Sequence, residues 1–260
     1  MEVIVTTEKR PSLEIIEEAK KLARKFKTSY VTRRHNTIES FKKHYRKNVL
    51  VVTSEGLVLH TLRGSKLFFH PGLLKIRLLN YLKTGKEAMV KAMDLRKGDA
   101  VLDCNLGLAQ DAVISAFVSE KMVVGVEKDP VIAEIVKRGL RSYEPKGKLS
   151  IAKDAFRRVE VKVGDNREFL KSLSDNSFDI VYFSPMFIKP KWKCDVMQPF
   201  RDVAVKDFIE PETLKEAERV ARKRVVIKIN KGVKDLFPFL KDYTLQESAT
   251  NVEYIYKRVD

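Results

Sequence analysis

The sequence has few of the residues that build metal centres. It contains two cysteines, Cys104 and Cys194, and neither lies in a CxxC motif. Its four histidines form no H-x-x-x-H pair of the kind that a helix uses to bind zinc. Isolated cysteines and histidines usually pack in the core or lie at the surface, so we expect no structural metal site.

Long apolar runs are also missing. No stretch reaches the roughly 18 apolar residues that a membrane-spanning helix needs. The first ten residues, MEVIVTTEKR, have the pattern of a β-strand rather than of a signal peptide. The 260 residues are 44% apolar and 33% charged, which suits one large globular domain with a small appendage. We therefore expect a soluble cytoplasmic protein that has no membrane partner.

Acidic residues are scarce relative to basic ones. The chain has 51 Lys and Arg against 35 Asp and Glu, a net charge of +16. Residues 1–80 alone hold 17 basic and 7 acidic residues, a net charge of +10. A positive charge of this size favours a polyanionic partner, so we expect the chain to bind nucleic acid.

Aromatic residues lie among the basic clusters of this first segment: Phe26, Tyr30, Phe41 and Tyr45. Cations beside aromatic rings are typical of surfaces that contact phosphates and stack on bases. The alternative is a set of solvated helix faces whose aromatic rings pack inward. For the segment as a whole we favour nucleic-acid binding, with Arg33 and Arg34 among the contacts.

The order of expected elements divides the chain into two parts. Residues 1–66 predict a small basic α+β domain: a strand, a helix that begins after Ser12, a short strand at SYVT, a helix over 37–45 and two further strands. Residues 67–260 alternate helices and strands, which predicts a Rossmann-like α/β fold with a mostly parallel sheet and helices on both faces. The last two expected strands, YTLQESA and NVEYIYKRV, are separated by only one or two residues, so we expect an antiparallel hairpin at the sheet edge.

Glycine is sparse where a dinucleotide site would need it. The segment AVLDCNLGLAQD predicts a strand, a turn and a helix start, which is the arrangement of a nucleotide-cofactor site. It contains only Gly107, whereas dinucleotide sites use G-x-G-x-x-G. The pattern disfavours NAD and suits a smaller ligand with a cationic group and no phosphate, such as S-adenosyl-L-methionine.

Ligands of parallel sheets bind at the carboxyl ends of the strands, so the residues at these ends are candidate site residues. Asp103 and Gly107 follow the first strand of the larger part, and Glu127 ends the second, where an acid commonly accepts the hydroxyls of a ribose. Asp165 follows the third strand and could accept the amino group of an adenine. Each acid also has a structural alternative: Asp103 could cap a loop, Glu127 could be a surface charge and Asp165 could be the N-cap of a helix.

Four segments in this order and spacing, DCNLGLAQDA, VVGVEKDP, VYFSPMF and RVVIKIN, resemble the class I S-adenosyl-L-methionine-dependent methyltransferases. Within that class they resemble the family that methylates the exocyclic N2 of a guanine in small-subunit ribosomal RNA. The similarity runs from about Phe69 to Asn230. The resemblance implies that Asp103, Gly107, Glu127 and Asp165 bind the cofactor. The predicted cofactor site also includes Asn105, Asp111, Lys128, Asn166 and Ser184.

By the same resemblance, Ser184, Pro185, Met186 and Phe187 would form the catalytic loop, although the family has Asp or Asn at the position of Ser184. A side-chain oxygen and a backbone carbonyl there could accept the N–H bonds of a base amine, and Phe187 could stack on the base. The next segment is basic and holds the only tryptophan. We expect substrate contacts from Lys189, Lys191, Trp192, Lys193 and Lys228.

The sequence thus predicts an RNA methyltransferase, acting on a guanine N2 of ribosomal RNA or on the small ribosomal subunit. Methylation of another base amine, such as adenine N6, is an alternative that the same loop could perform. A second alternative is a non-catalytic RNA-binding or assembly protein that keeps the cofactor pocket. A nicotinamide-dependent oxidoreductase fits least, because the glycine pattern does not match.

Overall fold

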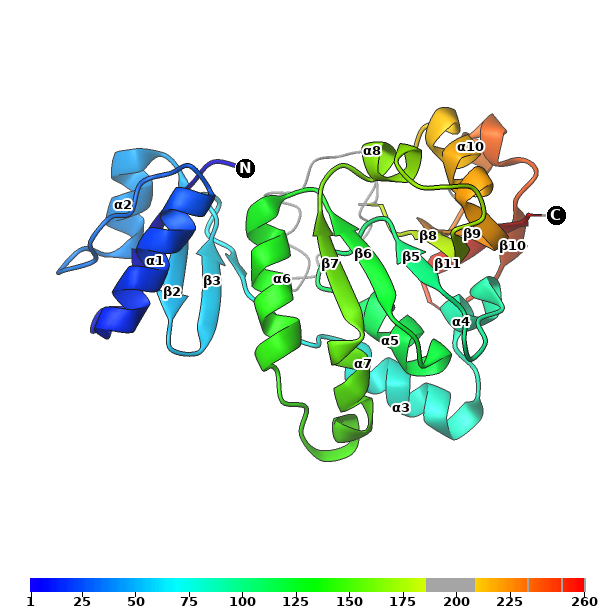
Figure 1. Cartoon of the computed structure of the whole chain (residues 1–260), viewed down its shortest axis with the longest axis horizontal. Coiled ribbons are helices and arrows are strands. Elements are labelled where there is room, and N and C mark those ends of the chain that lie inside the picture. Colours follow the sequence, from blue (N-terminus) through cyan, green and yellow to red (C-terminus); the bar gives the residue numbers. More distant parts are fainter. Residues whose placement is uncertain (186–208, 233, 249, 260) are drawn as a thin grey trace.

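The structure is a computed structural model that describes residues 1–185, 209–232, 234–248 and 250–259. These residues form a four-stranded sheet near the amino terminus and a seven-stranded sheet in the rest of the chain (Figure 1). In the described ranges, no helix has the length and apolar character needed to cross a bilayer.

The smaller sheet has the strand order β1-β2-β3-β4, with β1 and β2 parallel and the other neighbours antiparallel. Its strands are Val3–Thr7 (β1), Asn48–Thr53 (β2), Gly56–His60 (β3) and Lys66–Leu67 (β4). The SYVT segment contributes only an isolated bridge between Tyr30 and Val5. The sheet therefore extends to Leu67, one residue beyond the span expected from the sequence.

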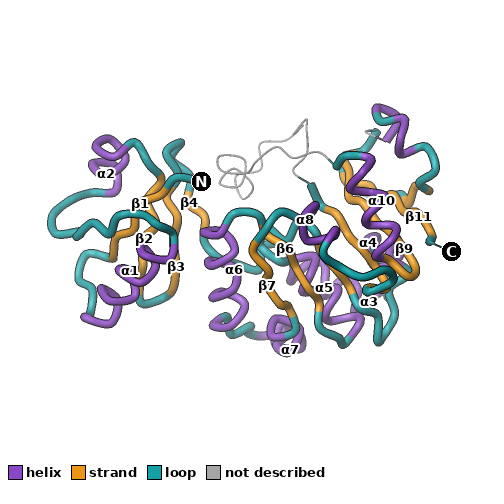
Figure 2. Tube along the Cα trace, turned by 45° about the horizontal axis from the view of Figure 1, so that its top comes forward, coloured by secondary structure: helices purple, strands orange, loops and turns teal. Residues whose placement is uncertain are grey.

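Two helices cover this sheet, one on each face (Figure 2). Helix α1 (Leu13–Lys25) begins after Ser12, whose side chain accepts a hydrogen bond from the N–H of Ile15, and α2 (Ile38–Tyr45) begins in the same way after Thr37. Because successive strand residues point to opposite faces, β1 and β2 give their valines and leucines alternately to the two helices. The residues that share a cluster with α1 are Val3, Val5, Leu50 and Val52, and those that pack with α2 are Ile4, Val49 and Val51.

The larger sheet has the order β10-β11-β9-β8-β5-β6-β7. Its strands are Val101–Asp103 (β5), Val123–Glu127 (β6), Val159–Val163 (β7), Phe178–Phe183 (β8), Ala221–Asn230 (β9), Thr244–Gln246 (β10) and Val252–Arg258 (β11). Strands β5 to β9 are parallel, and β10 and β11 are antiparallel to their neighbours. The Rossmann-like fold is confirmed. The loop of the terminal hairpin is longer than predicted, because β11 extends past the end of β10 to pair with Asn230 of β9.

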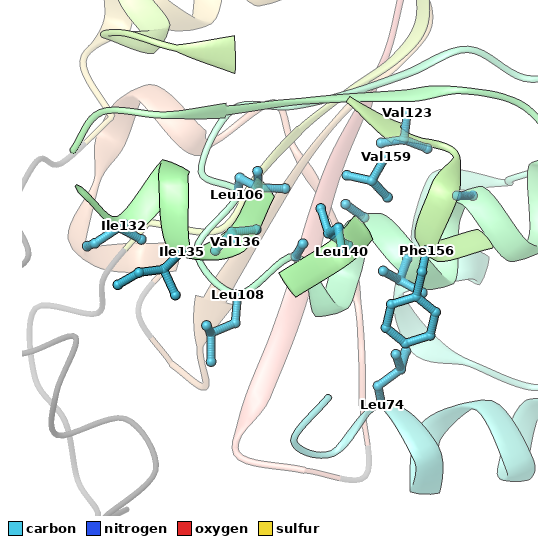
Figure 3. Packing of buried hydrophobic residues seen from close by; sticks show 14 of the residues in the cluster. Leu74, Leu106, Leu108, Val123, Ile132, Ile135, Val136, Leu140, Phe156 and Val159 are labelled. Atoms are coloured by element: carbon cyan, nitrogen blue, oxygen red, sulfur yellow. The ribbon is translucent and has the colours of Figure 1, made fainter. Parts of the chain in front are cut away.

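Helices lie on both faces of this sheet (Figure 1). They are Leu74–Thr84 (α3), Ala88–Met93 (α4), Gln110–Ser119 (α5), Pro130–Ser142 (α6), Lys153–Arg157 (α7), Asn166–Lys171 (α8) and Pro211–Val220 (α10), with 3-10 turns at Gly147–Ala152 (η1), Lys234–Leu236 (η3) and Pro238–Leu240 (η4). Helices α3 to α7 pack their apolar residues on one face (Figure 3), and α8 and α10 pack on the other. The sequence did not predict α7 or η1.

The two parts of the chain meet along α6. Arg138 of α6 forms an ion pair with Glu18 of α1, and Glu134 forms one with Lys25. Further along α6, Phe69 packs so closely against Gly139 that a Cβ atom at this position would collide with the ring. Charged and apolar contacts therefore hold the smaller sheet beside the larger one.

Candidate active site

The structure brings the predicted site residues to one edge of the larger sheet. Strands β8, β5, β6 and β7 are neighbours in this order and run parallel, so their carboxyl ends lie side by side. Asp103 ends β5, Glu127 ends β6, Asp165 follows β7 and Ser184 follows β8. The chain reverses its direction of travel across the sheet at β5, which is the position where open α/β sheets bind ligands.

The loop after β5 is held tightly to the next strand. Gly107 has a φ of 51°, a left-handed conformation that glycine adopts without steric cost, and its N–H donates to Oε2 of Glu127 at 3.2 Å. Leu106 lies over Gly125 of β6 so closely that a Cβ atom there would overlap its side chain. Both glycines therefore allow the loop to approach the strand, although the sequence pattern indicated only Gly107.

Asp103 and Glu127 are carboxylates whose hydrogen bonds come from the backbone. Asp103 is 1% exposed and accepts the N–H of Asn105 at 3.0 Å, and Glu127 accepts those of Gly107 and Asp129. Burial raises the pKa of Asp103 to about 7, with a further contribution from the charge of Asp111, and burial likewise raises the pKa of Glu127 to about 7. In the described part of the chain, neither carboxylate forms an ion pair.

These two acids suit a ligand that offers an ammonium group and hydroxyl groups. A cation near Asp103 would stabilise its charged form in this buried position, and hydroxyl donors could use the remaining lone pairs of Glu127. Glu127 is thus not the surface charge that the sequence left open as an alternative. Asp103 accepts a hydrogen bond within its own loop, as the capping alternative proposed, and this bond leaves its second oxygen available.

Asp165 is placed at the same edge but is engaged differently. Its side chain accepts the N–H of Arg167 and so caps α8, as the structural alternative proposed. It also receives the guanidinium of Arg167 at 2.8 Å and the ammonium of Lys128 at 3.1 Å. The hydrogen bonds from Arg167 and the charge of Lys128 hold its pKa well below the usual range. A contact between Asp165 or Lys128 and an adenine stays a prediction.

Two asparagines connect the loop after β5 with its neighbours. Asn166 Nδ2 donates to the carbonyl oxygen of Cys104 at 2.9 Å, and Asn105 Oδ1 accepts the N–H of Ser184 at 3.2 Å. Ser184 is partly exposed and Pro185 is buried. The other residues of the predicted catalytic loop and substrate segment lie outside the described residues: Met186, Phe187, Lys189, Lys191, Trp192 and Lys193.

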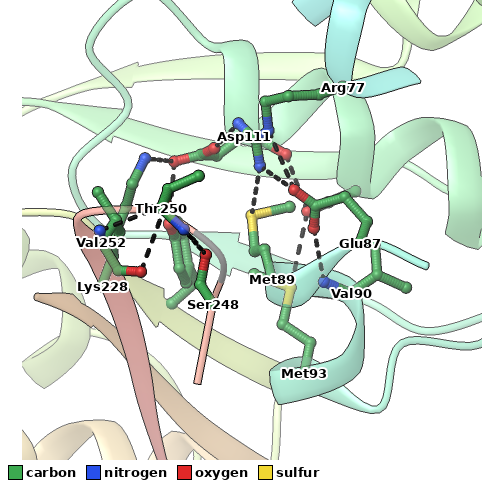
Figure 4. Close-up of polar contacts among 12 residues, drawn as sticks. Arg77, Glu87, Met89, Val90, Met93, Asp111, Lys228, Ser248, Thr250 and Val252 are labelled. Carbon is green, nitrogen blue, oxygen red and sulfur yellow. Dashed lines mark hydrogen bonds and ion pairs between the residues drawn. The ribbon is translucent and has the colours of Figure 1, made fainter. Parts of the chain in front are cut away.

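Asp111 and Lys228, predicted to contact cofactor and substrate, form part of a buried polar cluster (Figure 4). Asp111 at the start of α5 accepts from Lys228 of β9 and from the hydroxyl of Tyr182, both at 2.9 Å, and from Arg77 of α3 at 2.5 Å. Arg77 also pairs with Glu87, the N-cap residue of α4. Lys228 and Arg77 hold the pKa of Asp111 below its usual range despite burial.

Arg77, Glu87 and Tyr182 were missed by the sequence analysis. Their signal was weak, because each is a single polar residue in an otherwise helical or strand pattern. Arg77 and Tyr182 lie 34 and 71 positions from Asp111, and Glu87 lies 10 positions from Arg77, so no motif joins them in the sequence. The cluster ties three helices and two strands together beside the site.

Arg33 and Arg34 lie in the smaller part of the chain, in the loop before α2. Arg34 is exposed, and Arg33 is partly buried. The aromatic residues of this part pack inward, as the structural alternative proposed. Phe41 is 4% exposed, and Phe26, Tyr30 and Tyr45 are partly buried against the hydrophobic clusters. Apolar rings on amphipathic helices are buried because the sheet offers them an apolar face.

Most of the chain matches a known protein family. The model of the family described as "Putative SAM-dependent methyltransferase" matches residues 32–251. The chain belongs to this family of methyltransferases. It is therefore an enzyme that uses S-adenosyl-L-methionine (SAM), and the cofactor prediction is confirmed. This finding favours the enzyme over the non-catalytic alternative.

Individual proteins are also similar to this chain. YpiP of Bacillus subtilis, named an uncharacterized protein, is 40% identical over 227 residues, which are 86% of this chain and 88% of YpiP. Ribosomal RNA small subunit methyltransferase J of Buchnera aphidicola is 32% identical over 158 residues, 58% of this chain and 61% of that enzyme. A crystal structure of a SAM-dependent methyltransferase from Neisseria gonorrhoeae has a TM-score of 0.67 at 17% identity, covering 98% of this chain and 96% of that one. The last comparison supports the fold.

The described residues contain no group of three or more His, Cys, Asp and Glu side chains that could hold a metal ion. The contacts of this edge instead fit SAM. Asp103 could bind its ammonium group, and Glu127 could bind its ribose hydroxyls.

Proposed function

We propose that this methyltransferase acts on RNA and methylates an exocyclic base amine, the N2 of a guanine in small-subunit ribosomal RNA. The observation that carries the proposal is the position of Ser184 and Pro185. They follow β8 directly, and Asn105 of the cofactor loop holds the N–H of Ser184. A target base beside these two residues would lie next to the edge of the sheet that carries Asp103 and Glu127.

A base amine is a poor nucleophile because its lone pair is delocalised into the ring. The hydroxyl oxygen of Ser184 and the carbonyl oxygen of Pro185 can each accept one N–H bond of the amine. Two such bonds would hold the nitrogen in one orientation and raise the electron density on it, so these residues act by positioning. When bound, SAM supplies a methyl group on a positively charged sulfur. The amine nitrogen forms a bond to the methyl carbon as the bond between that carbon and sulfur breaks. The electron pair of the broken bond stays on the sulfur of the neutral thioether product, and one N–H proton passes to water.

RNA as the substrate is supported by the charge of the chain and by one group of relatives. The net charge of +16 is concentrated in residues 1–80, which carry +10. Methyltransferase J of Buchnera aphidicola, and the enzyme of the same name from Shewanella amazonensis at 30% identity, act by name on small-subunit ribosomal RNA. The similarity to these enzymes covers about three fifths of their length, so the guanine target is part of the proposal.

The test uses RNA and small ribosomal subunits from a strain that lacks this protein. Purified protein and SAM with a labelled methyl group are added to each, and the RNA is then digested to nucleosides. We expect label in N2-methylguanosine. Label in N6-methyladenosine would replace the guanine target with adenine. If neither the free RNA nor the small ribosomal subunits gained label, RNA would be rejected as the substrate.

A further inference from the structure

The smaller sheet presents polar side chains beside helix α2. Val49 of β2 packs under α2, and in the sheet register it lies opposite His60 of β3, which in turn lies opposite Lys66 of β4. Residues that are directly opposite one another on neighbouring strands point to the same face. His60 and Lys66 therefore lie on the face of the sheet that α2 covers.

Two more basic residues act electrostatically on His60 from other elements. Lys42 of α2 is 6% exposed, and its ammonium group contacts Oε1 of Glu39 at 2.9 Å. Arg33 comes from the loop before α2, and its Nε donates to the carbonyl oxygen of Asn36 at 3.0 Å. We call Arg33, Lys42, His60 and Lys66 the His60 surface.

The electrostatics of the His60 surface are unbalanced. Burial, together with the charges of Lys66, Lys42 and Arg33, lowers the pKa of His60 to about 4, against an opposite effect of Glu39. Burial also lowers the pKa of Arg33. Glu39 is already paired with Lys42, and in the described part of the chain neither Arg33 nor Lys66 forms an ion pair. Arg33 is partly buried and Lys66 is exposed. A partly buried cation without an anion is destabilised, so an anion added beside Arg33 would be bound favourably.

We propose that the His60 surface binds a phosphate group of the RNA backbone. The inference rests on the proposed function, because RNA is the polyanion that the enzyme would meet. A guanidinium group can donate two parallel hydrogen bonds to phosphate oxygens, and the ammonium groups of Lys42 and Lys66 supply further donors and charge. Neutral His60 can donate one hydrogen bond. When the ring takes up a proton, it gains a second N–H donor and a positive charge. Of these four residues, the basic clusters of the sequence contain Arg33 and Lys42, and strand register adds His60 and Lys66.

The first experiment measures binding of fluorescein-labelled oligouridine at a series of salt concentrations. The variant Arg33→Gln with Lys66→Gln should bind more weakly at low salt. Each lost phosphate contact should reduce the slope of log affinity against log salt by up to about 0.9. The control is Lys21→Gln with Arg24→Gln, which removes the same charge from exposed positions of α1, on the opposite face of the sheet. The control should keep the wild-type slope.

The second experiment follows the imidazole signals of His60 by NMR during a pH titration, with and without oligouridine. A phosphate beside the ring should raise the pKa of His60 from about 4 toward its ordinary value of 6.5. His35, which is exposed in the loop before α2, provides an internal reference. An unchanged titration of His60 in the RNA complex would overturn the proposal.

These outcomes can be separated from the proposed function. Equal losses of salt slope in the variant and the control would show that RNA responds only to net charge, and the His60 surface would then be rejected. Wild-type slopes in both would also reject it. In either case the labelled methyl transfer to RNA would still be observed if the proposed function is right, whereas its absence would reject RNA as the substrate.

Discussion

The side-chain oxygen Oδ1 of Asn105 accepts a hydrogen bond from the backbone N–H of Ser184 at 3.2 Å. The two residues are 79 positions apart in the chain. Asn105 belongs to the loop that follows β5, and Ser184 is the first residue after β8. This bond therefore couples the cofactor side of the site to the residue that we expect to hold the target amine.

We predict that Asn105→Ala slows methyl transfer without preventing folding. The N–H of Ser184 would lose its partner, and a lost hydrogen bond of this kind costs about 0.5 to 1.5 kcal/mol, or roughly a two- to tenfold fall in kcat. Steady-state kinetics with RNA and SAM would measure it. If kcat were unchanged and only the affinity for SAM fell, Asn105 would act on the cofactor, as the sequence pattern suggested.

We predict that Ser184→Asp keeps or raises turnover and that Ser184→Ala lowers it modestly. A carboxylate is a stronger acceptor for the amine N–H than a hydroxyl group, and a methyl group accepts nothing. Affinity for SAM, measured by calorimetry, should be the same in both variants and in the wild type. A loss of turnover in Ser184→Asp would show that the site is built for an uncharged acceptor.

Glu127 should be required for cofactor binding. Glu127→Ala should weaken SAM binding by about ten- to hundredfold, because charge-assisted bonds to the ribose hydroxyls would be lost. Calorimetry measures the change directly. An exposed ion pair of α1, between Lys20 and Glu17, provides a control, since Lys20→Ala should leave SAM binding unaltered.

The same residue should affect stability in a pH-dependent way. Burial raises the pKa of Glu127 from 4.5 to about 7, so between these pH values the folded protein binds a proton that the unfolded chain has released. The stability that this group contributes is therefore lost as the pH rises through about 7. In the cofactor-free protein, the Tm of Glu127→Gln relative to wild type should rise as the pH increases across this window. A constant difference in Tm would contradict the raised pKa.

Asp111 should matter for stability. Asp111→Asn would leave the cations of Arg77 and Lys228 without their common partner, and breaking a buried ion pair costs about 3 to 5 kcal/mol. Adding Lys228→Met should recover part of this loss. Urea unfolding would test both, with Asp175→Asn as the control, because Asp175 is 70% exposed in its pair with Arg219 and should cost at most about 1 kcal/mol. Normal stability together with weak SAM binding would assign Asp111 to the cofactor instead.

Much of the larger fold could be predicted from the sequence because its signals are local. The alternation of strand and helix patterns predicted the parallel sheet. The positions at the carboxyl ends of the strands predicted that Asp103, Glu127, Asp165 and Ser184 lie at one edge of it. Short elements without a clear apolar period, such as α7 and β4, were missed. Their few residues are held in place by tertiary contacts rather than by propensity.

The sequence by itself determined the class of fold, the edge of the sheet where the candidate site residues lie, and the excess of positive charge. Tertiary structure decided which charges are paired. In the sequence, nothing distinguishes Asp111 and Lys228 from the other acidic and basic residues of the site. In the structure they form an ion pair in a buried cluster with Arg77. His60 attracted no attention in the sequence, because its burial and its basic neighbours arise only from strand register and helix packing. Burial and partner distance control electrostatic energies, and both depend on residues far apart in the chain.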